Sequence, residues 1–209
     1  MAFGLQTGCE PDAMLQPGEM PRLLLHCCCA PCGGYALECL SPFFEITVLF
    51  YNPNINTHEE YNKRAEELKK LTVLAEYPNS VDTVISDYDS AEFETIAMPF
   101  WDDAEGGRRC RACFELRLGQ AARCAGKGGY DAFATTLSVS PHKNSSMLNE
   151  VGSILAEVTG VKYLSSDFKK NNGYLRSIEL SKKYDLYRQR YCGCAPSVKR
   201  AHAVGVDGR

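Results

Sequence analysis

The chain of 209 residues is 44% hydrophobic and 10% aromatic, which is enough to bury one sizeable core and excludes an intrinsically disordered protein. A formal net charge of −3 argues against a general nucleic-acid binder. Residues 162–209, however, carry eleven Lys or Arg against four Asp or Glu, and this basic segment is interpreted either as a surface for a polyanion or as a solvated helix face. No apolar run reaches the roughly 18 residues of a membrane span, and residues 1–21 show no signal peptide, so we expect a cytoplasmic protein with no membrane partner.

Short apolar runs that stop at turn signals predict strands, and stretches with helical spacing separate them. The expected strands cover residues 22–27, 44–51, 81–86, 131–137 and 161–164. The expected helices cover residues 33–40, 61–77, 90–98, 109–126, 144–158 and 173–186. Thr57 and Glu60 have the spacing of a capping box, which marks the start of the second helix.

Strands that alternate with helices predict an α/β fold, a single-domain Rossmann-like parallel sheet with helices on both faces. Residues 1–21 have no sustained periodicity, so we expect a flexible N-terminal extension before one catalytic domain at residues 22–209. In such a sheet ligands bind beyond the carboxyl ends of the strands. The loops HCCCAPC, NPN and SVSPHKN, which follow the first, second and fourth predicted strands, therefore indicate where the active site lies.

Eleven cysteines in a reducing compartment are poor candidates for structural disulfides, and their grouping as CCCxxC, CxxC and CxC indicates metal or redox chemistry. Cys9, Cys39 and Cys124 stand outside these groups and are interpreted as packing residues. Cys110 and Cys113 lie three apart at a helix start, which places both thiols on one face, as half of a zinc or iron–sulfur site requires.

The adjacent Cys28 and Cys29 favour an iron–sulfur cluster over a single ion. Consecutive side chains in an extended segment diverge, which is awkward for one tetrahedral zinc. A cluster of several irons has separate corners for the two thiolates, and Cys110 and Cys113 would then fill the other corners.

The pair Cys192 and Cys194 has two interpretations. A disulfide across one glycine closes a small strained ring that is easily reduced, which suits a labile redox switch. Alternatively, one or both sulfurs hold a second metal together with Cys32. His26, at the end of an apolar strand, is interpreted as a hydrogen-bonded core residue rather than a ligand.

Five motifs in the same order carry a resemblance to a known family: HxCCAPC, FYNPNI, RCRxCFELRL, DAFxTTL and YRQRYCGC. Over about residues 22–197 the chain resembles the epoxyqueuosine reductases of the QueH type, with Cys27 at the variable position of the first motif. The resemblance implies reduction of the epoxide of epoxyqueuosine, at the wobble position of tRNA, to queuosine as the last step of queuosine formation. It implies two partners, a tRNA carrying epoxyqueuosine and an electron donor that the sequence does not identify.

The same resemblance implies cofactors and site residues. A [4Fe-4S] cluster is implied, with an additional iron ion beside it and Cys32 as a further candidate metal ligand. The implied cluster ligands, carried over by motif, are Cys28, Cys29, Cys110 and Cys113. Cys192 and Cys194 are the implied catalytic residues, either as a redox-active disulfide or as ligands of the second iron. Residues 187–191 place two tyrosines around two arginines directly before this pair, a composition suited to stacking on loop bases of RNA.

Two other classes of protein stay open. An ATP-dependent tRNA sulfur transferase would have a similar sheet with an SGGxDS-like phosphate loop after the first strand, where this chain has CCCAPCGG. If this chain shares the PP-loop architecture, the similarity is then limited to the fold, and the nucleotide-binding site has been lost. A zinc-binding RNA module would hold colourless metal in a tetrahedral site, whereas an iron–sulfur protein is brown.

Overall fold

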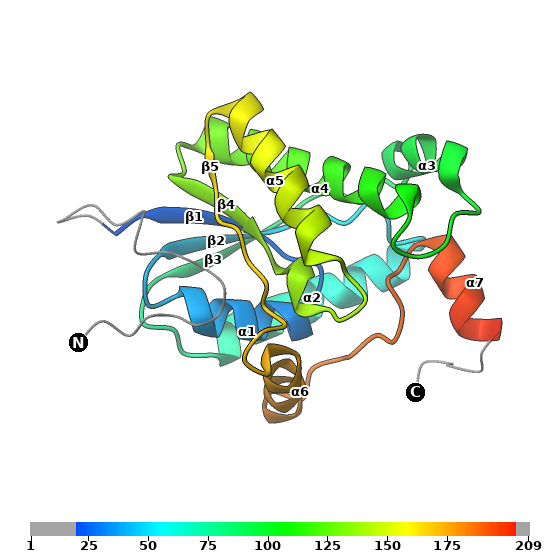
Figure 1. The fold of residues 1–209 in the computed structure, drawn as a ribbon. Coiled ribbons are helices and arrows are strands. Elements are labelled where there is room, and N and C mark those ends of the chain that lie inside the picture. Colours follow the sequence, from blue (N-terminus) through cyan, green and yellow to red (C-terminus); the bar gives the residue numbers. More distant parts are fainter. Residues whose placement is uncertain (1–19, 204–209) are drawn as a thin grey trace.

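The computed structural model describes residues 20–203, with the backbone alone at 200–203, and the predicted strands form one parallel sheet (Figure 1). The strands are β1 (Arg22–His26), β2 (Glu45–Phe50), β3 (Val81–Ile85), β4 (Ala132–Thr135) and β5 (Lys162–Tyr163). Their order is β3-β2-β1-β4-β5, and every neighbouring pair is parallel. The predicted Rossmann-like α/β fold is confirmed. Because the order reverses between β1 and β4, their carboxyl ends form the switch point at which such folds bind ligands.

Helices cover both faces of the sheet, as expected. One face carries α1 (Ala30–Leu40), α2 (His58–Leu74) and α6 (Gly173–Lys183), and the other carries α4 (Arg108–Gly128) and α5 (Ser145–Thr159) (Figure 1). The remaining elements are α3 (Ala91–Ala97), η2 (Met98–Phe100), η3 (Thr136–Val139) and α7 (Ala195–Ala203).

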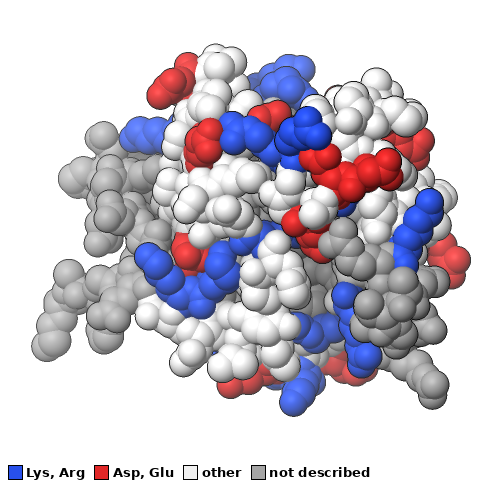
Figure 2. Space-filling model, turned by 45° about the vertical axis from the view of Figure 1, so that its right-hand side comes forward, with Lys and Arg blue, Asp and Glu red and all other residues white. Residues whose placement is uncertain are grey.

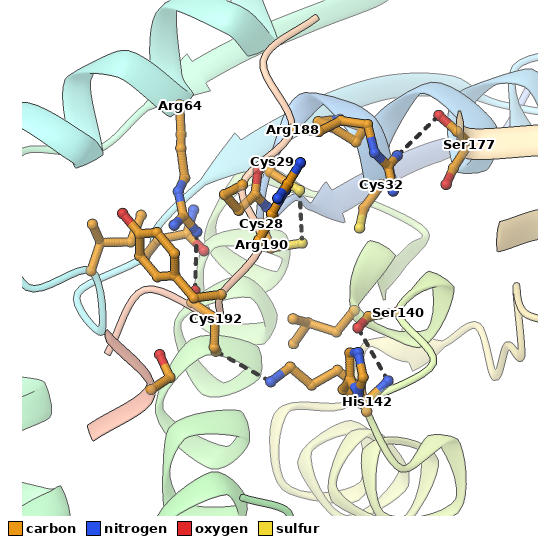
Figure 3. Close-up of a pocket in the computed structure, with 18 of the residues that line it drawn as sticks. Cys28, Cys29, Cys32, Arg64, Ser140, His142, Ser177, Arg188, Arg190 and Cys192 are labelled. Carbon is orange, nitrogen blue, oxygen red and sulfur yellow. Dashed lines mark hydrogen bonds between the residues drawn. The ribbon is translucent and has the colours of Figure 1, made fainter. Parts of the chain in front are cut away.

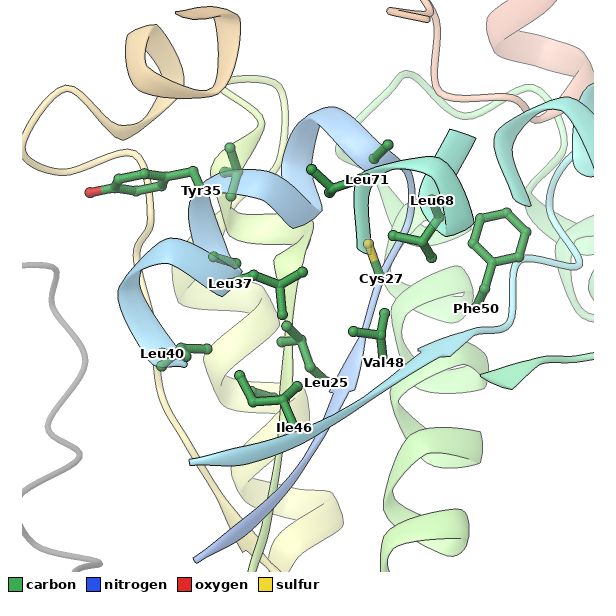
Figure 4. Close-up of a cluster of buried hydrophobic side chains, with 14 of the residues drawn as sticks. Leu25, Cys27, Tyr35, Leu37, Leu40, Ile46, Val48, Phe50, Leu68 and Leu71 are labelled. Carbon is green, nitrogen blue, oxygen red and sulfur yellow. The ribbon is translucent and has the colours of Figure 1, made fainter. Parts of the chain in front are cut away.

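The larger core lies between the sheet and the helices α1 and α2, and Figure 4 shows its side chains interleaved there. In β1, Leu23 and Leu25 face this core with Leu37 of α1 and Leu68 of α2, whereas Leu24 packs in the cluster under α4. Successive strand residues point to opposite faces, so a strand covered on both sides must be apolar throughout. This burial fixes β1 at the centre of the sheet and holds the loop after it in a defined place.

Local details differ from the expectations. β4 is shorter than predicted because the hydroxyl of Thr135 accepts a hydrogen bond from the Leu137 amide at 3.2 Å and starts η3. The capping box is half formed: Thr57 accepts from the Glu60 amide at 3.2 Å, but the Glu60 carboxylate bonds to Arg64 instead of reaching back. The helix α7 has no counterpart among the predicted helices.

Residues 1–19, with Cys9, lie outside the described part of the chain. The flexible extension and the division into extension and catalytic domain therefore stay predictions. Among the helices of the described residues, none combines the length and the apolar character that crossing a membrane demands.

Candidate metal and substrate site

A cavity of about 1130 Å³ opens beyond the carboxyl ends of β1, β2 and β4 (Figure 3). The segments that follow these three strands line it with Cys28, Cys29, Pro31, Cys32, Asn52, Asn54, Ile55, Leu137, Ser140, Pro141, His142 and Lys143. Residues 187–192, between α6 and α7, line it from the other side. The three loops that the sequence pointed to thus meet around one space.

The loop after β1 gathers Cys28, Cys29 and Cys32, whose sulfur atoms all lie within 4.8 Å of one another, so this group could bind a metal ion. Cys29 is the N-cap of α1 and Cys32 lies in its first turn. Hydrogen bonds from Cys28 and Cys32 hold the pKa of Cys29 well below its usual range, and hydrogen bonds with Cys28 and Cys29 raise the pKa of Cys32. One thiolate with two thiol donors is the charge state that this loop favours without metal.

The expected divergence of Cys28 and Cys29 is wrong for this structure, because their sulfur atoms are 3.6 Å apart. The chain bends at Cys28, in the short connection between the end of β1 at His26 and the start of α1 at Ala30, so the two residues are not part of a regular strand. Sulfur ligands of one tetrahedral ion, at about 2.3 Å from the metal, would lie under about 4 Å from each other. The geometry of Cys28 and Cys29 therefore does not exclude a single tetrahedral ion bound by both sulfur atoms.

Helix α4 brings the predicted CxxC pair to the same end of the sheet. Cys110 is buried and accepts a hydrogen bond from the Gly106 amide at 3.2 Å, and Cys28 packs against its apolar cluster. Cys113 is buried in a second cluster with Cys194. Cys110 and Cys113 do not belong to the compact group of three thiols. The structure therefore places the four predicted cluster ligands in one region, but their sulfur atoms do not form one compact group.

The CxC pair is asymmetric. The thiol of Cys192 lines the cavity and lies 3.2 Å from the ammonium of Lys143, whereas Cys194 is buried beside α3. A hydrogen bond from Cys194, with the charges of Lys143 and Arg117, lowers the pKa of Cys192 well below its usual range, and the same hydrogen bond raises the pKa of Cys194. The positive φ of Gly193, 114°, allows the turn between the two residues.

Three buried cations that the motif interpretation did not single out lie at the cavity: two contact thiols, and the third donates to the Cys192 carbonyl. They are Arg64, Arg117 and Lys143. Lys143 also contacts the Glu105 carboxylate at 3.1 Å, and Arg64 bonds to Glu60 at 2.7 Å. Arg117 follows Cys113 by four residues on α4, a spacing that places both on one helix face and is a sequence signal for its position.

His26 is a hydrogen-bonded core residue, as interpreted. Its ring nitrogens bond to the Thr135 hydroxyl at 2.9 Å and to the Tyr51 carbonyl at 3.1 Å, and the side chain is fully buried. Burial, with the charge of Arg117, lowers its pKa to about 3. The histidine is therefore neutral at physiological pH.

The tyrosine–arginine segment forms one wall of the cavity. Arg188 bonds to the Ser177 carbonyl, and Tyr187 bonds to Glu60, so both are fixed from the inner side. The ammonium of Lys63 covers the Tyr187 ring at 3.6 Å, while Arg190 is exposed at the cavity. Figure 2 shows basic and acidic side chains interspersed on the face it presents.

Thiols that could bind a metal ion lie with buried cations beyond the carboxyl ends of the parallel sheet, at the switch point where Rossmann-like α/β enzymes bind their ligands. The chain belongs to the epoxyqueuosine reductase QueH family, whose family model matches residues 23–200. It is 45% identical to the epoxyqueuosine reductase QueH of Streptococcus pyogenes serotype M1 over 90% of this chain and 73% of that relative. It is 43% identical to the relative of the same name in Staphylococcus epidermidis, over 91% of this chain and 80% of the relative. It is 35% identical to the relative of the same name in Thermotoga maritima, over 86% of this chain and 91% of the relative. The resemblance seen in the motifs is confirmed.

Proposed function

We propose that this protein is an oxidoreductase that reduces the epoxide of epoxyqueuosine in tRNA to the alkene of queuosine. The family match over residues 23–200 carries the proposal, because it covers the five strands except Arg22 and includes all seven motif cysteines. The relatives quoted above bear the name of this activity. A cavity of about 1130 Å³ has room for an extruded nucleotide, since pockets for small ligands measure about 300–1,000 Å³.

The donor chemistry supports an iron–sulfur cofactor. All ten described cysteines are free thiols, and soft thiolates in clusters are the ligands that iron–sulfur clusters take. We propose a [4Fe-4S] cluster whose ligands are Cys28, Cys29, Cys110 and Cys113. In the alternative use of the CxC pair, one or both of its sulfurs would hold an additional iron together with Cys32. The bound cluster supplies electrons one at a time.

The chain's own residues account for the remaining chemistry. Converting an epoxide to an alkene and water consumes two electrons and two protons. Closure of the Cys192 thiolate and the buried Cys194 thiol to a disulfide releases two electrons and one proton, and the asymmetry of the pair suits such a closure. The second proton then comes from the Lys143 ammonium. Lys143 holds a proton on Nζ beside the Cys192 sulfur at the cavity wall. The alternative, in which the same two sulfurs ligate the second iron, is decided by the experiments below.

Residues 187–191 are the proposed contact to tRNA. Their tyrosine rings and arginine planes are surfaces on which unpaired bases stack, and the exposed Arg190 is placed to meet a phosphate. An external donor, still to be identified, returns the electrons after each turnover.

The activity is tested with reconstituted protein, dithionite and tRNA that carries epoxyqueuosine, followed by mass spectrometry of the nucleosides. Conversion to queuosine is expected. The Cys192→Ser variant should lose turnover and keep most of its visible absorbance, while Cys124→Ser, near the end of α4 and not at the cavity, should keep both. Unchanged epoxide in the presence of an intact, reduced cluster would reject the function, and loss of colour in Cys192→Ser would show that this sulfur is a ligand.

The cofactor is tested by counting iron, zinc and sulfide in protein purified without oxygen. Four irons with four sulfides are expected, and a fifth iron if the second site is filled. The close contact between Cys28 and Cys29 favours one competing outcome, a single ion at the compact group of thiols. Zinc with no iron or sulfide would therefore overturn the cluster and support a zinc-binding protein instead.

A further inference from the structure

The buried cations beside the cavity differ in how their charges are balanced. Lys143 and Arg64 each have a carboxylate partner, from Glu105 and Glu60. Arg117 has none: within the described residues no ion pair involves it, although it is only 2% exposed. A buried charge without a partner is strongly unfavourable, so such groups are paired or coordinate ions.

The contacts of Arg117 turn its charge toward the thiols. One end of the guanidinium donates to the side-chain oxygen of Asn52, a neutral group, and the other lies 3.9 Å from the Cys113 sulfur. Asn52 is itself fixed, because its amide donates to the Cys27 carbonyl at 3.0 Å. The Nε atom of Arg117 is buried with no hydrogen-bond partner.

This placement is rigid. Arg117 projects from the interior of α4 one turn after Cys113, and both Arg117 and Asn52 border the cavity beside Cys28. The guanidinium is therefore held at one position relative to the thiols from two independent elements, a helix and the loop after β2. A fixed cation that lacks a carboxylate is complementary to an anion that occupies the thiol site.

We propose that Arg117 is a positioning residue whose fixed charge balances an anionic iron–thiolate centre and raises the reduction potential of that centre. The proposal rests on the proposed function, since it requires a cluster at the thiols. Reduction adds an electron and makes such a centre more negative, so a nearby cation stabilises the reduced state more than the oxidised state. Asn52 keeps the guanidinium aimed at the thiols without neutralising it.

The test is a redox titration of the reconstituted cluster, followed by its visible absorbance, in three variants and the wild type. Arg117→Met removes the charge and is expected to lower the reduction equilibrium constant at least tenfold, which is 59 mV for a one-electron couple. Arg117→Lys keeps the charge and should stay within about threefold of the wild type. Arg123→Met is the matched control, because this exposed arginine of the same helix bonds to Gln120, does not line the cavity and should leave the potential unchanged.

An Arg117→Met protein that holds the cluster at the potential of the wild type overturns the proposal. If Arg117→Met does not fold or does not bind the cluster, Asn52→Asp tests the proposal instead. This variant places a carboxylate against the guanidinium and should also lower the reduction potential of the cluster. An unchanged potential in Asn52→Asp then overturns it. A wild-type protein without iron and sulfide overturns both proposals, whereas a loaded wild type that leaves the epoxide intact rejects only the function.

Discussion

The contact between Lys143 and Cys192 makes a sharp prediction about thiol reactivity. Removing the ammonium with Lys143→Met should slow alkylation of Cys192, because the thiolate loses a charged donor at 3.2 Å in a site where the lysine is only 8% exposed. A hydrogen bond to a charged group contributes about 1.5–3 kcal/mol, and about 1.4 kcal/mol is a factor of ten. At a pH where little thiolate remains in the variant, alkylation should therefore be about tenfold slower or more.

The assay uses metal-free protein, so that no ligand bond protects the sulfur. Iodoacetamide labelling is followed against pH, and the labelled peptides are quantified by mass spectrometry. The Lys143→Arg variant should retain most of the rate, and the labelling of Cys124, far from the lysine, provides an internal reference in every sample. A pH profile for Cys192 that is the same in Lys143→Met and wild type would refute the electrostatic account of this pair.

Three further predictions follow from single sites. The pKa of His26 is lowered from 6.5 to about 3, so its contribution to the free energy of unfolding is complete above pH 6.5 and is lost as the pH falls toward 3. The free energy of unfolding of the metal-free protein, measured with urea, should therefore fall by about 2 kcal/mol from this group between pH 7.5 and 5. The His26→Gln variant should lack this part of the pH dependence. Gly173→Ala should destabilise the protein by about 1–3 kcal/mol, because the new Cβ would clash with the Phe168 carbonyl oxygen. Gly34→Ala should be neutral or slightly stabilising in the same denaturation assay, because the nearest atom to its new Cβ lies at 3.6 Å. Equal stabilities of the two variants would contradict this account. Cys110→Ala should abolish the visible absorbance of the reconstituted protein, and a variant that keeps its full colour would remove Cys110 from the ligand set.

Local patterns were sufficient for the fold. Each strand of the sheet lies within a predicted strand, since a strand buried on both faces needs an apolar run and each crossover needs a helical period. The position of the site followed from the same information, because parallel strands with helical crossovers bring their carboxyl ends to one edge. The helix α7, which begins directly after Cys194, was missed although its nine residues have the amphipathic pattern of a helix.

By itself the sequence determined the class of fold, the edge of the sheet that carries the site and the residue types that occupy it, since all three depend on patterns that span a few neighbouring residues. The tertiary structure alone decided how these residues meet. Lys143 contacts Cys192 across 49 positions of the chain, and Arg117 bonds to Asn52 across 65. Such contacts depend on how α4 and the loops pack against the sheet. Even the neighbours Cys28 and Cys29 were misjudged, because the turn from β1 into α1 sets the direction of their side chains and residue spacing does not record it.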